Sequence, residues 1–337
     1  MIKNLEIKNF KSIKNLNLEC KRINVFIGKP NTGKSNILEA LGILSFGRFC
    51  IIGADLKEFV RFEYMNNLFY NENLEDSITI KTDGKTLIIG FDSEKEIFWG
   101  RYRKETYPMP VPQEVLFSFE YDYTHKRGCS CPDPTKLPFK FYRFSVRKEF
   151  PRKEVAFLLP PSGDNLLALL RSHKELRKLV KDIFHEYGLR VVLKPQENKM
   201  EVQKEIEDII ISHPYPLVSD TLQRLIFYLA AIETNKDSVI VFEEPEAHAF
   251  PYYTKYLAER IALDDNNNQY FISTHNPYFL LPIIEKTPKD QVGIFITYFE
   301  DYQTRVKSLS EEDIKEIMDM EIMDMKIDVF FNIERFL

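Results

Sequence analysis

The sequence predicts an α/β fold with a central, mainly parallel sheet, an antiparallel β subdomain and a helical subdomain. A buried strand, a glycine-bearing loop and a helix follow one another around residue 30. Strands and helices alternate again after residue 217, whereas strand-like runs separated by turn signals fill the middle of the chain. This arrangement indicates one α/β core assembled from two separated segments.

The composition excludes several classes of protein. The 337 residues include 46 Lys and Arg against 51 Asp and Glu, and the net charge of −5 argues against an overall basic nucleic-acid binder. The longest apolar run, 225–232, falls well short of the roughly 18 residues of a membrane span, and the opening residues lack the apolar core of a signal peptide. Four cysteines in a chain of this length form no disulfide framework. We therefore expect a cytoplasmic protein without a membrane partner.

The chain is interpreted as a single head, 1–337. Segments 1–76 and 217–300 are expected to form the core, with an inserted antiparallel β region at about 77–159, a helical region at about 160–216 and an acidic segment at 301–337. In chain order, the spacing of apolar residues predicts strands at 5–10 and 23–27, a helix at 36–44, several strands between 77 and 144, helices at about 165–187 and 217–232, a strand at 238–242, a helix at 250–263, a strand at 270–273 and a helix from 277.

The first loop has the composition of a phosphate-binding loop. Residues Gly28–Ser35 read GKPNTGKS, which matches G-x-x-x-x-G-K-[ST] with a strand before it and a helix after it. Glycines let the backbone turn its N–H groups toward phosphate oxygens, and the following helix N-terminus adds partial positive charge. Lys34 supplies a cation for the β- and γ-phosphates of ATP, and the Ser35 hydroxyl is suited to Mg²⁺. The alternative is a chance match or a degenerate loop that has lost its nucleotide. The predicted nucleotide-binding residues are Gly28, Asn31, Thr32, Gly33, Lys34, Ser35 and Asn36.

A second strand ends in carboxylates. Residues 238–246 read SVIVFEEPE, and carboxylates at the end of a buried strand are costly unless a cation lies beside them. In a P-loop core this end lies next to the phosphates, so Glu243 is the predicted Mg²⁺ carboxylate and Glu244 the general base that activates water. The alternative is a solvated loop after a core strand.

His275 follows the next strand, in YFISTHNP. A histidine at the same edge of the sheet can hydrogen-bond a γ-phosphate or the attacking water. A structural histidine is the alternative. The predicted catalytic residues are therefore Glu244, Lys34 and His275.

These segments resemble the ABC-type ATPase heads of the SMC, RecF and OLD (overcoming lysogenization defect) proteins, and among them the OLD-like AAA-15 and AAA-21-type ATPases. IKNLEIKNFKSIKNLNL resembles the opening hairpin of that group, NVFIGKPNTGKSNILEAL its Walker A segment, VIVFEEPEAHAFP its Walker B signature and FISTHNPYFL its H-loop. The resemblance spans 1–44 and about 217–284 and implies a P-loop NTPase with an ABC-ATPase-like head. The segment 45–216 lacks the heptads of an SMC arm, and few residues follow His275, so we expect a head without a Toprim nuclease domain.

The sequence departs from the group at two places. Phe250 stands where members often carry a second His, and the segment that reaches across the dimer begins Ser219-Asp220 instead of Ser-Gly. By resemblance, Ser219 contacts the γ-phosphate of a partner protomer. The Q-loop is expected within about 46–69, where Asn66 and Asn67 are weak substitutes for its Gln.

Two further segments have open interpretations. Residues 140–153 interleave aromatic residues with basic residues, among them Arg143, Arg147 and Lys148. This composition is typical of a face that follows the phosphates of a nucleic acid and stacks on its bases. The alternative is a strand with buried aromatic residues and solvated charges. Cys129 and Cys131 are two free thiols in a turn or part of a metal site with His125.

The function expected is Mg²⁺-dependent ATP hydrolysis in a head-to-tail homodimer that acts as a conformational switch in DNA repair or anti-phage defence, with DNA or a separate effector protein as partner. The alternative is a nucleotide-gated module that recruits a protein and has little or no ATPase activity.

Overall fold

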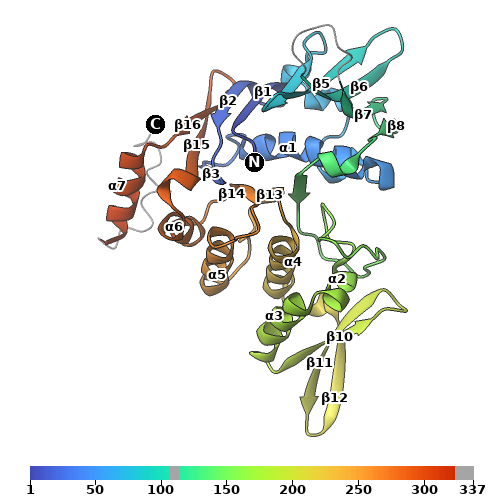
Figure 1. The fold of residues 1–337 in the computed structure, drawn as a ribbon, viewed down its shortest axis with the longest axis vertical. Helices are drawn as coiled ribbons and strands as arrows, with labels where there is room; N and C mark the ends of the chain where they lie inside the picture. The colour runs from blue at the N-terminus through green and yellow to red at the C-terminus, as the bar shows by residue number, and fades with distance from the viewer. Residues whose placement is uncertain (106–113, 323–337) are drawn as a thin grey trace.

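The computed structural model describes residues 1–105 and 114–322. Its elements are stacked in layers (Figure 1). An antiparallel sheet covers one side of helix α1 (Lys34–Phe49), a mainly parallel sheet covers the other side, and helices cover the far face of that second sheet. Helix α1 is thus enclosed between two sheets.

The mainly parallel sheet has six strands and forms the centre of the fold. Its order is β16 (Gln303–Ser308), β15 (Val292–Glu300), β3 (Ile23–Gly28), β14 (Gln269–Ser273), β13 (Val239–Glu243) and β9 (Phe139–Tyr142). The five strands from β15 to β9 pair in parallel, whereas β16 is antiparallel to β15. The predicted α/β class with a mainly parallel sheet is therefore confirmed. In register, Glu243 pairs with Ser273, and Ser273 pairs with Phe26, so these strands end together.

The antiparallel sheet has seven strands. Its order is β2 (Ile13–Glu19), β1 (Asn4–Phe10), β4 (Ile78–Thr82), β5 (Lys85–Asp92), β6 (Ile97–Lys104), β7 (Val115–Tyr121) and β8 (Lys126–Ser130). Two assignments differ from the sequence prediction. Strands β1 and β2 join the strands of the inserted region, and β9, expected within that region, belongs to the parallel sheet. Alternation of apolar and polar residues identifies a strand but not its partner, because the hydrogen bonds of a sheet join distant segments.

Helices α4 (Asp220–Thr234), α5 (Pro251–Ala262) and α6 (Pro277–Lys286) cover the far face of the parallel sheet. Helices α2 (Leu166–Ser172) and α3 (Lys174–His185) lie beyond α4, and a three-stranded sheet of β10 (Leu189–Lys194), β11 (Lys199–Ile206) and β12 (Ile209–Pro214) projects from them. Helix α7 (Glu311–Ile322) follows β16. Short 3-10 turns lie at Cys50–Ile52, Leu56–Glu58, Met65–Leu68, Tyr70–Glu72, Pro134–Lys136, Tyr215–Leu217 and Lys289–Gln291.

The region 160–216 is not purely helical, contrary to the expectation from the sequence. The helix predicted at 165–187 is broken at His173, whose φ of −99° and ψ of 107° are extended, and residues 189–214 form β10, β11 and β12. The sequence signal for these strands is weak, because β12 is polar or exposed along most of its length and therefore lacks a buried face marked by alternating apolar residues. The boundaries of the predicted regions otherwise stay predictions, and residues 323–337 of the acidic segment lie outside the described part.

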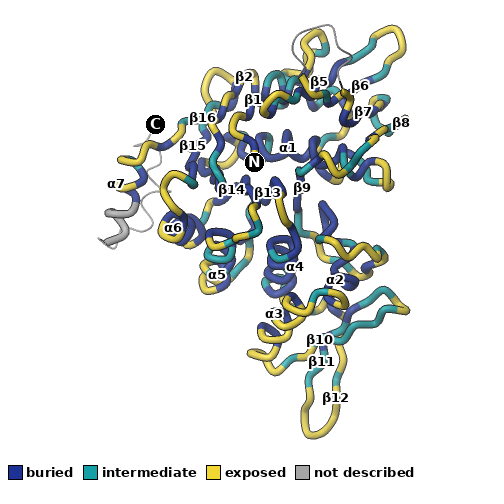
Figure 2. The backbone as a smooth tube through the Cα atoms, viewed as in Figure 1, coloured by how far each residue is buried: buried dark blue, intermediate teal, exposed yellow. Residues whose placement is uncertain are grey.

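Two hydrophobic clusters flank the parallel sheet, which is why nearly every residue of α1 and of the central strands is buried (Figure 2). Along β13, Ile240 and Phe242 pack toward α4 and α5, whereas Val239 and Val241 pack toward α1. The stretch Lys34–Ile52 is long and apolar enough to cross a membrane by length and composition, and 72% of an 18-residue segment within it is buried inside the protein. Its enclosure between two sheets accounts for that composition.

Candidate nucleotide-binding site

The loop between β3 and α1 has a backbone that requires its glycines. Gly28 has a φ of 152° and Gly33 a φ of 94°. A Cβ on Gly28 would lie 2.3 Å from the Thr297 carbonyl oxygen, and one on Gly33 would lie 2.0 Å from Thr304 Oγ1. Thr297 belongs to β15 and Thr304 to β16, so these two strands lie too close to the loop for a side chain at either glycine.

Side chains within the loop hold it in place. Thr32 Oγ1 donates to the Lys29 carbonyl oxygen at 2.8 Å and lies 2.7 Å from Thr297 Oγ1. Asn36 Nδ2 donates to Ser12 Oγ at 2.6 Å. The side chains of Thr32 and Asn36, both predicted to bind nucleotide, therefore contact protein groups here, and Asn31 is exposed with a φ of 63°.

Lys34 is folded back onto the loop. Its Nζ donates to the carbonyl oxygens of Gly28 at 2.9 Å and Lys29 at 2.8 Å. Burial lowers the pKa of Lys34 to about 8, although the negative charge of Glu244 acts in the opposite direction. A lysine in this state has a strong electrostatic preference for an anion beside it.

Ser35 and Glu243 lie next to each other, as the sequence predicts for a metal-binding pair. Burial raises the pKa of Glu243, but Arg143, the Ser35 hydroxyl and Arg61 together outweigh it, so that pKa lies below its ordinary value. A carboxylate and a hydroxyl are the oxygen ligands that Mg²⁺ takes from a P-loop core, so this pair fits the ion.

Two arginines also bind Glu243, an arrangement that the sequence patterns did not reveal. Arg61 Nη2 lies 2.6 Å from Glu243 Oε1, and Arg143 Nε lies 3.1 Å from Glu243 Oε2. Both arginines also bind Glu39, through Arg61 Nε at 2.7 Å and Arg143 Nη2 at 3.1 Å. Glu39 is fully buried on α1 and is further paired with Lys11. We call Lys11, Glu39, Arg61, Arg143 and Glu243 the arginine–glutamate network.

One signal for this network was present in the sequence. Glu39 stands among apolar residues of the predicted helix, and a carboxylate on a buried helix face needs cations nearby. Arg61 falls in the window 46–69 searched for the Q-loop, whereas Asn66 and Asn67 bind Glu72 at 2.6 and 3.0 Å. Arg61 is thus the residue of that window that reaches the end of β13.

The interpretation of 140–153 as a nucleic-acid face needs correction at two positions. Arg143 belongs to the arginine–glutamate network, and Arg147 Nη2 lies 2.6 Å from Asp164 Oδ1. Carboxylates thus satisfy both guanidinium groups, whereas Lys148 is exposed.

Glu244 and His275 meet at the ends of β13 and β14. His275 Nε2 lies 3.4 Å from Glu244 Oε1, and the Glu244 backbone N–H donates to the Ser273 carbonyl oxygen at 3.1 Å. Burial and the positive charge of Lys34 lower the pKa of His275, while Glu244 raises it. The three predicted catalytic residues, Lys34, Glu244 and His275, are thus within electrostatic reach of one another.

Ser219 lies at the start of α4, where its side chain makes no capping hydrogen bond. Thr221 Oγ1 donates to the His248 carbonyl oxygen at 2.9 Å, which brings the start of α4 next to the loop after β13. Phe250 immediately precedes α5 and is 68% exposed.

Cys129 and Cys131 are free thiols, and a thiol contact joins Cys129 to Cys50. Within residues 1–105 and 114–322, no group of three or more His, Cys, Asp or Glu side chains is arranged to hold a metal ion.

The chain has recognisable relatives. A family model described as "AAA domain, putative AbiEii toxin, Type IV TA system" (AAA_21) matches residues 23–281. An "ATP/GTP phosphatase" of Helicobacter pylori is 21% identical over 328 residues, which cover 83% of this chain and 86% of that protein. A "DNA replication and repair protein RecF" of Clostridioides difficile is 41% identical over 66 residues, only 19% of this chain and 18% of RecF.

Solved structures of SMC heads share the fold. An SMC head bound to the C-winged helix domain of ScpA aligns with a TM-score of 0.52 at 15% identity, over 94% of this chain and 99% of that chain. A second SMC head, with an extended coiled coil and bound to the C-terminal domain of ScpA derived from Pyrococcus furiosus, aligns with a TM-score of 0.51 at 15% identity, over 96% and 99% of the two chains. The predicted ABC-ATPase-like head is confirmed as a fold.

Proposed function

The chain belongs to the AAA_21 family and is a P-loop ATPase of the SMC and RecF type, and we propose that it hydrolyses Mg²⁺-ATP as a head-to-tail homodimer that switches conformation. The observation that carries the proposal is the convergence of Lys34, Glu244 and His275 at the ends of three neighbouring strands. These groups have the charges that in-line attack of water on a γ-phosphate needs.

Each residue has a proposed role. The N–H groups that follow Gly28 cradle the phosphates, and Lys34 leaves the carbonyl oxygens of the loop to bind the β- and γ-phosphates. Ser35 and Glu243 would hold Mg²⁺, which supplies positive charge against the phosphate oxygens. Glu244 accepts the proton of the attacking water, and His275, largely neutral at pH 7, hydrogen-bonds that water or the γ-phosphate.

Exposed apolar side chains on the surface beside the site support self-association. Large apolar side chains are exposed at the starts of α4 and α5, where Leu217 is 73% exposed, Phe250 68% and Tyr252 59%. Exposed apolar groups next to a ligand site are typical of interaction surfaces. In the proposed dimer, Ser219 of one protomer reaches the γ-phosphate held by Lys34 of the other.

The test is ATP turnover by the purified protein, with Glu244→Gln measured alongside. Turnover that falls at least about 100-fold in Glu244→Gln, with ATP binding retained, is the expected result because general-base removal typically costs this much. Sedimentation of Glu244→Gln with ATP should then reveal a dimer that Phe250→Asp prevents. Equal turnover of the Glu244→Gln variant and the parent protein would contradict the assigned base.

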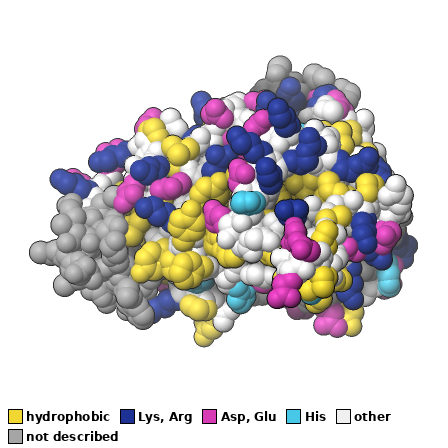
Figure 3. Space-filling view, turned by 90° about the horizontal axis from the view of Figure 1, so that it is seen from below, with side chains coloured by type: hydrophobic (Ala, Val, Ile, Leu, Met, Phe, Trp, Pro, Cys, Tyr) yellow, Lys and Arg dark blue, Asp and Glu magenta, His cyan; other side chains and the backbone are white. Residues whose placement is uncertain are grey.

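The biological output is proposed as DNA repair or anti-phage defence in the cytoplasm. The RecF relative supports a DNA-linked role, and Figure 3 shows Lys and Arg side chains gathered in the upper half of the face seen from below. Duplex DNA should then stimulate turnover in a salt-sensitive way, and Lys148→Ala is a cleaner probe of binding than Arg143→Ala, which would disrupt the arginine–glutamate network.

A nucleotide-gated module that recruits a protein is the second candidate. Its support is the occupation of Glu243 by Arg61 and Arg143, together with Asp220 where the group has Gly. The solved SMC heads are bound to part of ScpA, which supports a protein partner. ATP binding without turnover, with a protein retained only in the presence of ATP, would favour this candidate.

A further inference from the structure

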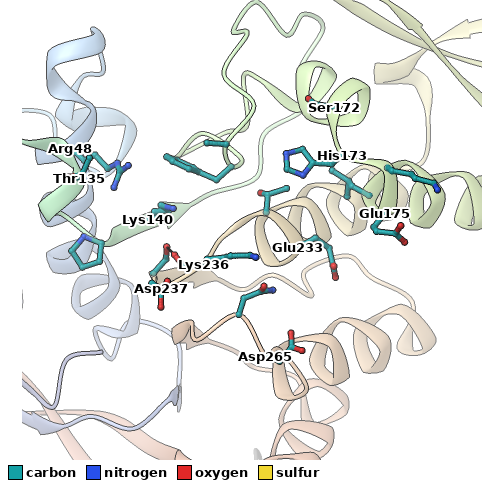
Figure 4. A pocket seen from close by; sticks show the side chains of 18 residues that line it. Arg48, Thr135, Lys140, Ser172, His173, Glu175, Glu233, Lys236, Asp237 and Asp265 are labelled. Atoms are coloured by element: carbon teal, nitrogen blue, oxygen red, sulfur yellow. Dashed lines mark hydrogen bonds between the residues drawn. The ribbon is translucent and has the colours of Figure 1, made fainter.

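A cavity of about 850 Å³ (Figure 4) is lined by residues at the amino ends of the parallel strands, and these ends lie opposite the strand ends that carry the nucleotide-binding site. Lys140 on β9 and Ser238, immediately before β13, line it. Arg48 near the end of α1 and Thr234 at the end of α4 line it as well. A volume of this size lies in the usual range of small-molecule sites.

The cavity contains a buried lysine with no carboxylate partner. Lys140 is 4% exposed. Its Nζ donates to Asn235 Oδ1 at 2.5 Å and lies 3.5 Å from the centroid of the Phe157 ring. Across the described ranges Lys140 forms no ion pair. A buried lysine is almost always paired with an acid, so the charge of this ammonium is left uncompensated.

The amine is held in place by a fixed hydrogen-bond chain. Asn235 Nδ2 donates to Tyr142 Oη at 2.8 Å and to the Ala231 carbonyl oxygen at 2.6 Å, so Asn235 must turn its oxygen toward Lys140. Tyr142 Oη in turn donates to the Leu158 carbonyl oxygen at 2.6 Å. An ammonium has three N–H donors. One of them donates to Asn235 Oδ1, and another side of the ammonium faces the Phe157 ring. Capacity for a further acceptor remains toward the cavity, into which Lys140 points (Figure 4).

A second cation lies on the same side. Arg48 Nη1 donates to the Leu137 carbonyl oxygen at 2.9 Å, and its guanidinium carbon lies 5.1 Å from the Phe157 ring centroid. Burial and the charge of Arg48 lower the pKa of Lys140 to about 7. His173, Lys174 and Lys236 add basic groups around the cavity.

The acidic residues of the cavity do not neutralise this pair. Glu233 is paired with Arg260, and Asp237, whose Oδ1 accepts a hydrogen bond from Asn267 Nδ2 at 2.6 Å, does not act on the pKa of Lys140. Glu175 and Asp265 also line the cavity, and neither contributes to the pKa of Lys140. In Figure 4, Glu175 and Asp265 lie on the side away from Arg48 and Lys140.

We propose that this cavity is a second ligand site, which binds a small molecule through an oxyanion group, phosphate or carboxylate, seated against Lys140 and Arg48. The oxyanion supplies the missing negative charge and accepts the remaining N–H donors, and Phe157 lies beside it. Neither the family nor the proposed ATPase requires this site, and the proposal stands independently of ATP hydrolysis.

Pyridoxal 5′-phosphate is the probe, because it carries a phosphate and an aldehyde. An unprotonated lysine nitrogen forms a bond to the aldehyde carbon, the oxygen leaves as water, and borohydride reduces the C=N bond to a stable amine that peptide mass spectrometry locates. At pH 7.5 an ordinary lysine is neutral in only about one molecule in a thousand. Lys140 is therefore expected to react on the order of tenfold faster than Lys236, an exposed lysine of the same cavity.

Competition by inorganic phosphate tests whether an oxyanion binds in the cavity. Phosphate should slow labelling of Lys140 at least about fivefold, both in the parent protein and in Lys34→Ala, in which the phosphate loop is impaired. With Lys34→Ala as the background, phosphate should also raise the Tm of the protein and of its Lys236→Gln variant but not of its Lys140→Gln variant. If Lys140 is unlabelled, or if phosphate leaves its labelling unchanged, the proposal is wrong. Labelling is measured on the unsubstituted protein, so the labelling test remains decisive even if Lys140→Gln does not fold.

Discussion

Arg61 and Glu243 form an ion pair across 182 positions of the chain, with 2.6 Å between Arg61 Nη2 and Glu243 Oε1. The same guanidinium binds the fully buried Glu39 through its Nε at 2.7 Å. One arginine thus connects the carboxylate at the end of β13 to the helix that begins at the phosphate-binding loop.

Arg61→Ala should reduce the free energy of unfolding by about 1 to 3 kcal/mol, because it removes a charged donor from the buried Glu39 and another from Glu243. Arg127→Ala is the control, since it breaks a surface pair with Asp122 at 3.7 Å and should cost less than about 1 kcal/mol. Urea unfolding measures both. Equal effects of the two substitutions would show that Arg61 makes only a surface contact.

Nucleotide affinity should weaken as the pH rises above about 8. The free Lys34 has a pKa of about 8, and phosphate favours its protonated form, so each pH unit above this value should cost up to about tenfold in affinity. Lys34→Arg should remove this dependence, because an arginine stays protonated. Titration of a fluorescent ATP analogue between about pH 7 and 9.5 tests this. The same decline in Lys34→Arg would assign the dependence to another group.

Stability should depend on pH through Glu246. Burial raises its pKa from 4.5 to about 7, Thr274 Oγ1 donates to its Oε1, and its buried Oε2 has no partner among the described residues. The folded protein therefore binds this proton more tightly than the unfolded chain does. The contribution to stability is fully present below pH 4.5 and is lost as the pH rises through about 7.

Glu246→Gln should not show this loss, because its side chain is neutral at every pH. Relative to Glu246→Gln, the parent protein should lose up to about 3 kcal/mol between pH 4.5 and 8. The matched control is Glu259→Gln. It removes a carboxylate on the surface of α5 that lies 3.9 Å from Lys255. Parallel pH profiles for the parent protein and Glu246→Gln would contradict the prediction.

Gly28→Ala should be far more harmful than Gly188→Ala. Gly188 has a φ of 66° with open space around its Cβ position, so alanine there costs only the left-handed backbone, about 1 to 2 kcal/mol. At Gly28 the Cβ would lie 2.3 Å from the Thr297 carbonyl oxygen, which adds about 1 to 3 kcal/mol more or opens the loop. Thermal unfolding and nucleotide binding of the two variants separate these effects. Equal losses would mean that β15 moves aside without cost.

The motif residues could be predicted because each lies at the end of a short local pattern. A strand, GKPNTGKS and a helix adjoin in sequence, and the strands before Glu244 and His275 are continuous apolar runs. Parallel strands end at one edge of a sheet, so the prediction that Lys34, Glu244 and His275 meet needed only the strand directions.

The remaining positions could not be predicted in this way. Arg143 has the same neighbours in sequence whether it faces nucleic acid or Glu39, and only the distance of 3.1 Å between them separates the two interpretations. Lys140 likewise reads as a polar residue of an alternating strand, although it is buried beside Phe157.

The sequence by itself determined the phosphate-binding loop, the carboxylates after β13 and the α/β class, because local spacing and apolar periodicity dictate strands, helices and glycine-bearing turns. Only the tertiary structure decided which strands pair, how Arg61 and Arg143 join Glu39 to Glu243, and that Lys140 lies in a cavity. The physical reason is that sheet hydrogen bonds and ion pairs act over a few ångströms in space. Segments that are more than 100 residues apart in the chain come within that range only after the two sheets have packed around α1.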